Sequence, residues 1–244
     1  MQPVLNIKLH LFILVSYFTG GIFYAQNDVK SEVLKINQTF LSLQKYSMDI
    51  EHVYYIDGSK EKVVSQNKST YKRNGDMIYI KQLHTETVLN KKYAINIDSR
   101  NKYIILSYRN HTSNKKEIDA NDMLIRLDSI LTIYETTNLD KKENGVNEIT
   151  FGFKKGSAVK SITVNYNSKT YIINSVKANY TKAIEQGGKK YIASEIVYRN
   201  FNLNPVFEKG IFSESSFVNI TKNQIIGTGA FSNYQVINKL TKKR

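Results

Sequence analysis

The sequence predicts a mainly β fold (α+β), a single curved antiparallel sheet or half-barrel of about ten strands covered by two helices. Segments of alternating apolar and polar residues follow one another across short turns such as Asp57-Gly58 and Asn74-Gly75, as in an antiparallel meander. The 244 residues include 17 Tyr and 11 Phe but only 2 Pro, which suits long strands. An open sheet of this size curls, and helices that close it would leave an apolar cavity.

Residues 1–26 have the features of a cleaved secretory signal peptide. Lys8 precedes a short apolar run, and the small residue Ala25 stands near its end. A membrane anchor is the alternative, but the stretch 9–25 is short for a span and is interrupted by Ser16 and by Gly20-Gly21. We therefore expect residues 27–244 to form one domain that is exported to the periplasm or secreted.

The mature chain is predicted to open with an amphipathic helix of about four turns. Asn27 or Asp28 can cap its start, and polar residues separate the apolar ones. The apolar residues recur mostly at steps of three and four: Val29, Val33, Leu34, Ile36, Phe40, Leu41 and Leu43. A helix with one wide apolar face must lie on another element, and nearly everything that follows is strand.

Six strands are expected next, at residues 47–56, 63–72, 77–83, 88–89, 93–97 and 103–108. In the first of them Met48, Ile50, His52 and Tyr54 share one face, because successive side chains of a strand point to opposite sides. Their short polar connections indicate consecutive antiparallel pairing.

A second amphipathic helix is predicted over residues 119–135, where Met123, Leu127, Ile130 and Tyr134 recur at helical steps. Further strands are then expected at residues 147–153, 159–166, 170–178 and 191–201. Residues 211–220 and 234–240 would add a last strand or an irregular cover. We find no internal repeat and no linker between domains.

The charge and composition exclude several classes of function. The net charge is +14, but lysines are spread along the chain and arginine, the preferred reader of bases and phosphates, is scarce. We therefore expect no nucleic-acid partner, while an anionic membrane surface remains compatible with the charge. The chain has no Cys, which excludes disulfides, thiolate metal sites and a cysteine nucleophile.

The sequence contains no recognisable catalytic motif, and we expect no catalytic, cofactor-binding or metal-binding residue. His52, His84 and His111 are not spaced as metal ligands on one element. Asp49 and Glu51 share a strand face about 7 Å apart, as in a glycosidase pair, but the same spacing occurs on any solvated strand face. A hydrolase with unrecognised residues remains an alternative.

Two segments carry a resemblance to known proteins. The segment after the export signal reads Leu41-Ser42-Leu43-Gln44-Lys45-Tyr46 followed by Ser47-Met48-Asp49-Ile50-Glu51. This segment resembles the start of the LolA/LolB-like periplasmic lipoprotein carriers. The C-terminal part of the chain contains Asn204-Pro205-Val206-Phe207-Glu208-Lys209, Phe212-Ser213-Glu214 and Tyr234-Gln235-Val236-Ile237-Asn238. In these residues it resembles uncharacterised exported proteins of Bacteroidetes. The resemblance implies a helix-covered half-barrel that binds a lipid or the acyl chains of a lipoprotein in its concave space, without catalysis.

The expected function is thus an exported, monomeric, non-enzymatic binder or carrier of a lipid or acylated ligand. Burial of the acyl chain would contribute about 0.8 kcal/mol per CH₂. The predicted cavity lining consists of apolar residues of both helices and the sheet: Leu34, Phe40, Leu41, Met48, Ile50, Tyr79, Leu127, Ile130, Leu131, Ile162 and Val164. The alternative is that these residues pack against one another, which would favour a cell-envelope structural or interaction protein with a filled core.

Overall fold

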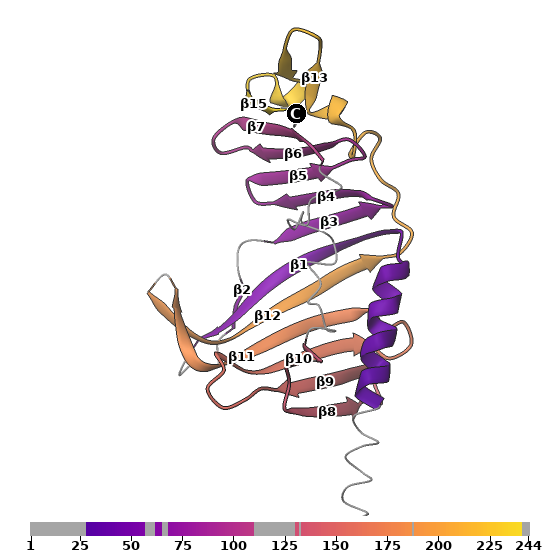
Figure 1. The fold of residues 1–244 in the computed structure, drawn as a ribbon, viewed down its shortest axis with the longest axis vertical. Helices are drawn as coiled ribbons and strands as arrows, with labels where there is room; N and C mark the ends of the chain where they lie inside the picture. The colour runs from indigo at the N-terminus through magenta and orange to yellow at the C-terminus, as the bar shows by residue number, and fades with distance from the viewer. Residues whose placement is uncertain are drawn as a thin grey trace, which may run out of the picture.

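The computed structural model describes residues 28–56, 62–64, 68–109, 130–131, 133–186 and 188–240. One large open sheet runs through the molecule. A helix at residues 28–42 lies along one half of it, and the C-terminal segment covers the other half (Figure 1). The prediction of a mainly β protein built on a single curved sheet is therefore confirmed.

Over the described residues the sheet has 13 strands, more than the predicted number of about ten. Their bounds are β1 Lys45–Ile56, β2 Lys62–Val64, β3 Ser69–Asn74, β4 Met77–Gln82, β5 Thr85–Leu89, β6 Tyr93–Asp98, β7 Tyr103–Tyr108, β8 Thr136–Lys141, β9 Val146–Gly152, β10 Val159–Asn167, β11 Ile173–Gln186, β12 Lys189–Asn202 and β15 Gln235–Lys239. The spatial order is β15-β7-β6-β5-β4-β3-β1-β12-β11-β10-β9-β8, and β2 pairs with β1. The first strand thus lies in the middle and joins two meanders.

Several predicted details are wrong. The expected strand at residues 63–72 overlaps β2 and β3, which pair with β1 in different registers, β8 was not predicted, and β15 pairs with β7 in parallel rather than antiparallel orientation. Among the described residues only 28–42 form a helix of several turns. Most of the predicted second helix lies outside the described residues. At its end, the Tyr134 N–H donates to the Ile130 carbonyl at 3.2 Å, as in one helical turn.

The helix covers an apolar core on one face of the sheet, here called the helix face. The registers place Met48, Tyr71 and Ile80 in one row of this face across β1, β3 and β4. Val33 and Ile36 of the helix are both 0% exposed in this core. Complete burial of such side chains contributes about 1.5–3 kcal/mol each, which holds the helix on the sheet.

The C-terminal segment covers a second core on the opposite face. It contains 3-10 turns at Glu214–Ser216 and Gly229–Phe231 and a small hairpin of β13 (Val218–Ile220) and β14 (Ile225–Gly227). Phe212, Phe217 and Val218 are buried there against a cross-strand row that begins with Tyr79 and Val88. Residues 211–220 and 234–240 were expected to form a last strand or an irregular cover. They form both, since residues 211–220 belong to the irregular cover and residues 235–239 form the strand β15.

Candidate ligand-binding face

The helix packs directly on the sheet. Its residues Val33, Ile36 and Phe40 are at most 5% exposed. The Phe40 and Phe201 rings form a T-shaped contact with their centres 6.1 Å apart, and the Tyr46 ring stacks on the Phe201 ring with their centres 5.3 Å apart. The region directly beneath these residues is therefore filled by side chains, and a ligand would have to lie beside the helix.

A buried polar contact fixes the helix to β10. The Tyr166 hydroxyl donates to the Glu32 carboxylate at 2.6 Å, and both residues are buried. The Asn147 side-chain amide donates to the Tyr166 oxygen at 3.3 Å, and the Lys35 ammonium lies 2.9 Å from Glu32. Burial raises the Glu32 pKa, but the hydrogen bonds from Tyr166 and Lys35 outweigh it and hold the pKa below its usual value. Glu32 therefore stays ionised and anchors the helix.

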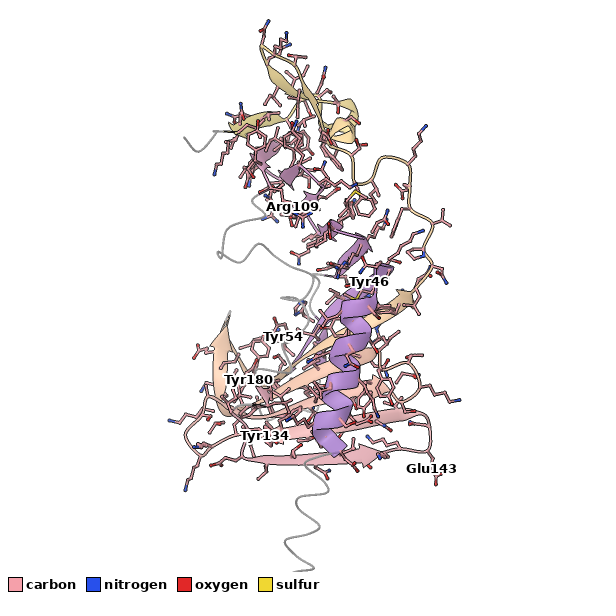
Figure 2. All side chains as sticks on the ribbon, turned by 45° about the vertical axis from the view of Figure 1, so that its right-hand side comes forward. Tyr46, Tyr54, Arg109, Tyr134, Glu143 and Tyr180 are labelled. Atoms are coloured by element: carbon pink, nitrogen blue, oxygen red, sulfur yellow. The ribbon has the colours of Figure 1, made fainter. Side chains whose placement is uncertain are left out.

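Beside the helix, the same face carries a row of partly exposed residues. Tyr54 of β1 is paired with Ser194, Ser194 with Ala178, and Ala178 with Ile162, so the row crosses β1, β12, β11 and β10. Tyr54 and Tyr180 lie to one side of the helix in Figure 2. We call the partly exposed residues of this surface the open band: His52, Tyr54, Ile162, Ala178, Tyr180 and Ile196.

The open band contains two tyrosines, Tyr54 and Tyr180, and the Tyr180 hydroxyl has a polar partner. The hydroxyl groups of Tyr180 and Ser194 are 2.6 Å apart, and the rings of Tyr54 and Tyr191 are centred 5.1 Å apart. Such side chains suit the border of a binding surface, because the ring contacts apolar groups while the hydroxyl keeps a polar partner.

The hairpin of β11 and β12 limits the open band on the side away from the helix. Both strands have 14 residues, and their register shifts between Asn179 and Ile184. The outer part of this hairpin bends out of the plane of the neighbouring strands (Figure 1). Register shifts of this kind bend and twist a strand. The helix and the bent hairpin thus stand on either side of an apolar strip of sheet.

The structure places the predicted lining residues in different environments. Phe40, Met48, Ile50, Ile130 and Val164 are buried in the core under the helix, and Leu131 and Ile162 pack against it. Tyr79 belongs to the second core on the opposite face. Leu34 and Leu41 were expected on the packed side of the helix, but they are 48% and 61% exposed. Leu127 lies outside the described residues.

Three residues of this surface were not predicted from the sequence as candidates: Ala178, Tyr180 and Ile196. The predicted strand ended at residue 178, although the alternation of Val176, Ala178 and Tyr180 continues beyond it. That alternation was the available signal. The pairing of β12 with β1, which joins this hairpin to the first strand, is a long-range feature, so the surface that these strands form together did not follow from the alternation.

The carboxylates considered for glycosidase chemistry lie on the other side of β1. Asp49 accepts hydrogen bonds from Thr70 at 3.0 Å and Asn200 at 2.7 Å. Glu51 pairs with Lys68 at 2.8 Å and Arg199 at 2.6 Å. The hydrogen bonds from these two cations hold the Glu51 pKa below its usual value. Both groups thus stabilise cross-strand contacts, and over the described part of the chain no group of three His, Cys, Asp or Glu could hold a metal.

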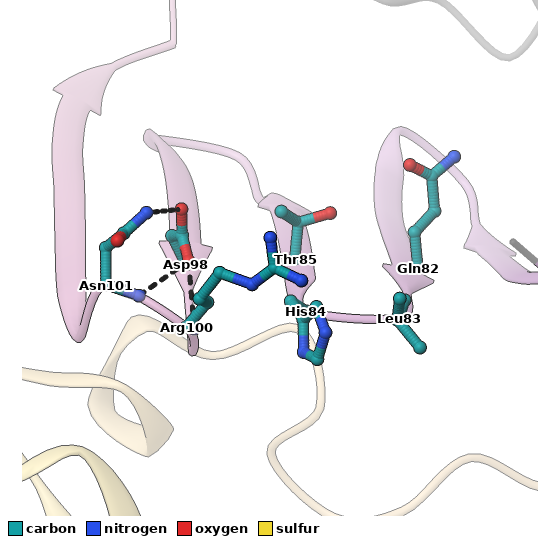
Figure 3. A pocket seen from close by; sticks show the side chains of 7 residues that line it. All are labelled: Gln82, Leu83, His84, Thr85, Asp98, Arg100 and Asn101. Atoms are coloured by element: carbon teal, nitrogen blue, oxygen red, sulfur yellow. Dashed lines mark hydrogen bonds between the residues drawn. The ribbon is translucent and has the colours of Figure 1, made fainter. Parts of the chain in front are cut away.

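A pocket of about 410 Å³ also opens at the turns that follow β4 and β6 (Figure 3). Asp98 accepts from the backbone N–H groups of Arg100 and Asn101, both at 2.9 Å, and therefore shapes the turn. Leu83 and His84 of the neighbouring turn are exposed. We assign no ligand to this pocket, because its polar contacts are those of an ordinary turn.

Comparison with known proteins gives only distant similarities. No protein family and no curated protein matches the sequence. The fold is similar to an uncharacterised conserved protein of Thermus thermophilus, with a TM-score of 0.43, 7% identity and coverage of 87% of this chain and 99% of that chain. Lipoprotein LppX of Mycobacterium tuberculosis has a TM-score of 0.35 and 9% identity, with coverage of 72% of this chain and 96% of that chain. A LolA superfamily protein of Nitrosomonas europaea has a TM-score of 0.23 and 7% identity, with coverage of 76% of this chain and 98% of that chain.

These similarities concern overall shape at very low identity, and no assignment of function rests on them. Within the described ranges, no helix combines the length and apolar character needed to cross a bilayer.

Proposed function

We propose that this chain is a LolA-like, non-enzymatic protein that binds or carries a lipid or acylated ligand on the open band. The observation that carries the proposal is an apolar strip, including Ile162, Ala178 and Ile196, that stays partly exposed beside the packed face of the helix. Exposed apolar surface with polar groups at its border is typical of binding sites. Each acyl CH₂ removed from water there would contribute about 0.8 kcal/mol.

The proposal includes export of a single domain, residues 27–244, to the periplasm or beyond after removal of residues 1–26. The signal segment lies outside the described residues, so this part depends on the sequence features of a secretory signal. Cell fractionation and the intact mass of the mature chain test it. A chain that retains residues 1–26 and stays in the cytoplasmic fraction would contradict export.

Native mass spectrometry tests the ligand proposal. The protein is purified from an exporting host without detergent, and bound lipids are then extracted with solvent. We expect an added mass that matches a phospholipid or an acylated peptide. Protein that is bare on purification, and still bare after incubation with envelope lipids, would contradict the proposal.

Two variants of adjacent residues on β11 locate the ligand. Ala178→Lys places an ammonium group in the open band, whereas Asn179→Lys places it on the opposite face of the same strand. We expect Ala178→Lys to lose the lipid because the acyl chain would have to desolvate the charge. Asn179→Lys should retain the lipid. Equal lipid content in both variants, with unchanged circular dichroism, would exclude the open band as the site.

We also propose that the edge of the molecule beside the helix contacts an anionic membrane. Three apolar side chains are exposed here: Leu34 and Leu41 of the helix, at 48% and 61%, and Val206 of the segment that follows β12, at 98%. The Lys45 ammonium lies 5.4 Å from the centre of the Phe207 ring, which ties this segment to the strand that follows the helix. Exposed apolar side chains beside lysines fit the boundary between anionic headgroups and acyl chains.

Vesicle sedimentation tests this contact. We expect binding to phosphatidylglycerol vesicles, weaker binding to phosphatidylcholine vesicles, and weaker binding at high salt because surface charges are screened. Val206→Asp should reduce the bound fraction, whereas Ile226→Asp, at an exposed site in β14, should not. A bound fraction that is the same for both kinds of vesicle and is unchanged by either substitution would contradict the proposal.

The packed core under the helix favours a second candidate, a cell-envelope interaction protein that carries no lipid. Phe40, Tyr46 and Phe201 fill the helix–sheet contact with aromatic rings. Mass spectra without an added lipid, together with a co-purified envelope protein, would support this candidate.

A further inference from the structure

A second pocket lies on the face of the sheet opposite the open band, between β3–β5 and the C-terminal segment. Its volume is about 430 Å³, within the range of small-molecule sites. The sheet contributes Lys72 and Tyr79 from one cross-strand row and Thr70, Lys81 and Glu86 from the next. The C-terminal segment contributes Glu208, Lys209, Ile211, Ser216, Phe217 and Phe231.

Two side chains on the sheet side of the pocket contact the Glu86 carboxylate. The Tyr79 hydroxyl donates to Glu86 at 2.7 Å, and the Lys81 ammonium lies 3.2 Å from the same carboxylate. Burial and the bond to Glu86 raise the Tyr79 pKa, so the phenol remains neutral. Glu86 is therefore satisfied by groups already in the protein.

Two lysines at the pocket have no carboxylate partner among the described residues. The Lys72 ammonium lies 5.4 Å from the centre of the Tyr79 ring, and Lys209 stands on the C-terminal side. Glu208 also lines the pocket, so three ammonium groups face two carboxylates. Lys81 and Glu86 pair with each other, so Lys72, Lys209 and Glu208 leave the pocket with one net positive charge.

The apolar side of the pocket comes from Ile211 and two phenylalanines. Phe217 is buried and Phe231 is partly exposed, and their ring centres are 5.5 Å apart. A pocket with unpaired ammonium groups on one side and aromatic rings on the other matches a molecule that has an anionic and an apolar end.

We propose that this pocket binds a small anionic amphiphile. Its carboxylate or phosphate group is held by Lys72 and Lys209, and its apolar part contacts Phe217 and Phe231. The site is independent of the open band because the two lie on opposite faces of the sheet. It takes one short molecule rather than the long acyl chains assigned to the open band.

Isothermal titration with three probes of equal chain length tests the chemistry: hexyl phosphate, hexanoate and hexanol. We expect at least one anion to bind about tenfold more tightly than hexanol, because a contact with a charged group exceeds a neutral one by roughly that factor. Preference for hexyl phosphate would indicate a phosphate ester, and preference for hexanoate a fatty acid. Hexanol binding as tightly as both anions would overturn the proposal.

Variants of the full exported chain locate the probe. The double variant Lys72→Gln with Lys209→Gln should bind the preferred anion about tenfold more weakly. The control, Lys182→Gln with Lys190→Gln in the β11–β12 hairpin, should bind it as the unsubstituted chain does. Ala178→Lys should also leave anion binding unchanged, even where it removes a lipid. An unchanged affinity in the first variant, or a loss in Ala178→Lys, would place the anion elsewhere and overturn the proposal.

Discussion

The contact between Glu32 and Tyr166 allows a sharp prediction about how the helix is held on the sheet. Glu32 is 8% exposed and Tyr166 is 0% exposed. In Glu32→Ala the Tyr166 hydroxyl loses its 2.6 Å acceptor and keeps only the 3.3 Å contact with the Asn147 amide. A hydrogen bond to a charged group contributes roughly 1.5–3 kcal/mol, so we expect the free energy of unfolding to fall by about 2–3 kcal/mol. In a domain of this size that lowers Tm by about 4–12 °C.

The same contact predicts a dependence on pH. The folded-state pKa of Glu32 lies below its usual value of 4.5. The ionised carboxylate therefore stabilises the folded protein fully above about pH 4.5 and progressively less as the pH falls through the folded-state pKa. Glu32→Gln keeps an oxygen that accepts from Tyr166 but removes the titrating group, so this part of the acid destabilisation should disappear.

Thermal unfolding followed by circular dichroism between about pH 3 and pH 7 measures both effects. Lys35→Ala is the matched control, since Lys35 also contacts Glu32 but its side chain is 45% exposed. Its Tm should change little, because exposed ion pairs are screened by water and salt. The reasoning is refuted if Glu32→Ala and Lys35→Ala have the same Tm, or if Glu32→Gln retains the full acid sensitivity of the original chain.

Three further outcomes are expected. Ile36→Ala removes a side chain that is 0% exposed and should lower the free energy of unfolding by about 2–5 kcal/mol in urea titrations. Gly227→Ala places a Cβ against the Phe231 carbonyl oxygen, so the C-terminal segment should show faster amide hydrogen exchange while the core under the helix keeps its protection. Arg199→Gln removes a cation from Glu51 and should raise the Glu51 pKa measured by carbon-13 NMR, whereas an unchanged value would contradict the ion pair.

The periodicity of the sequence was sufficient for the local elements. Steps of three and four from Val29 to Phe40 predicted the helix, and clean alternation around Ile162 and Val164 predicted β10. The second predicted helix shows the limit of this approach. Its pattern ran directly into Thr136–Lys141, which pairs with β9 as the edge strand β8. Polar edge strands carry little periodic signal, since only one neighbour and one face restrain them.

Local patterns of apolar and polar residues were therefore sufficient for the fold class, the position of the helix and most strands, and the residues that share a strand face. Which faces are covered depends on contacts between distant parts of the chain. The tertiary structure placed Leu34 and Leu41 on the exposed side of the helix and Tyr79 in a second core under the C-terminal segment. Alternation shows that residues two apart point the same way, but the partner that covers them comes from distant parts of the chain. The open band and the lysine-lined pocket depend on such long-range pairing, and neither is visible in any local pattern.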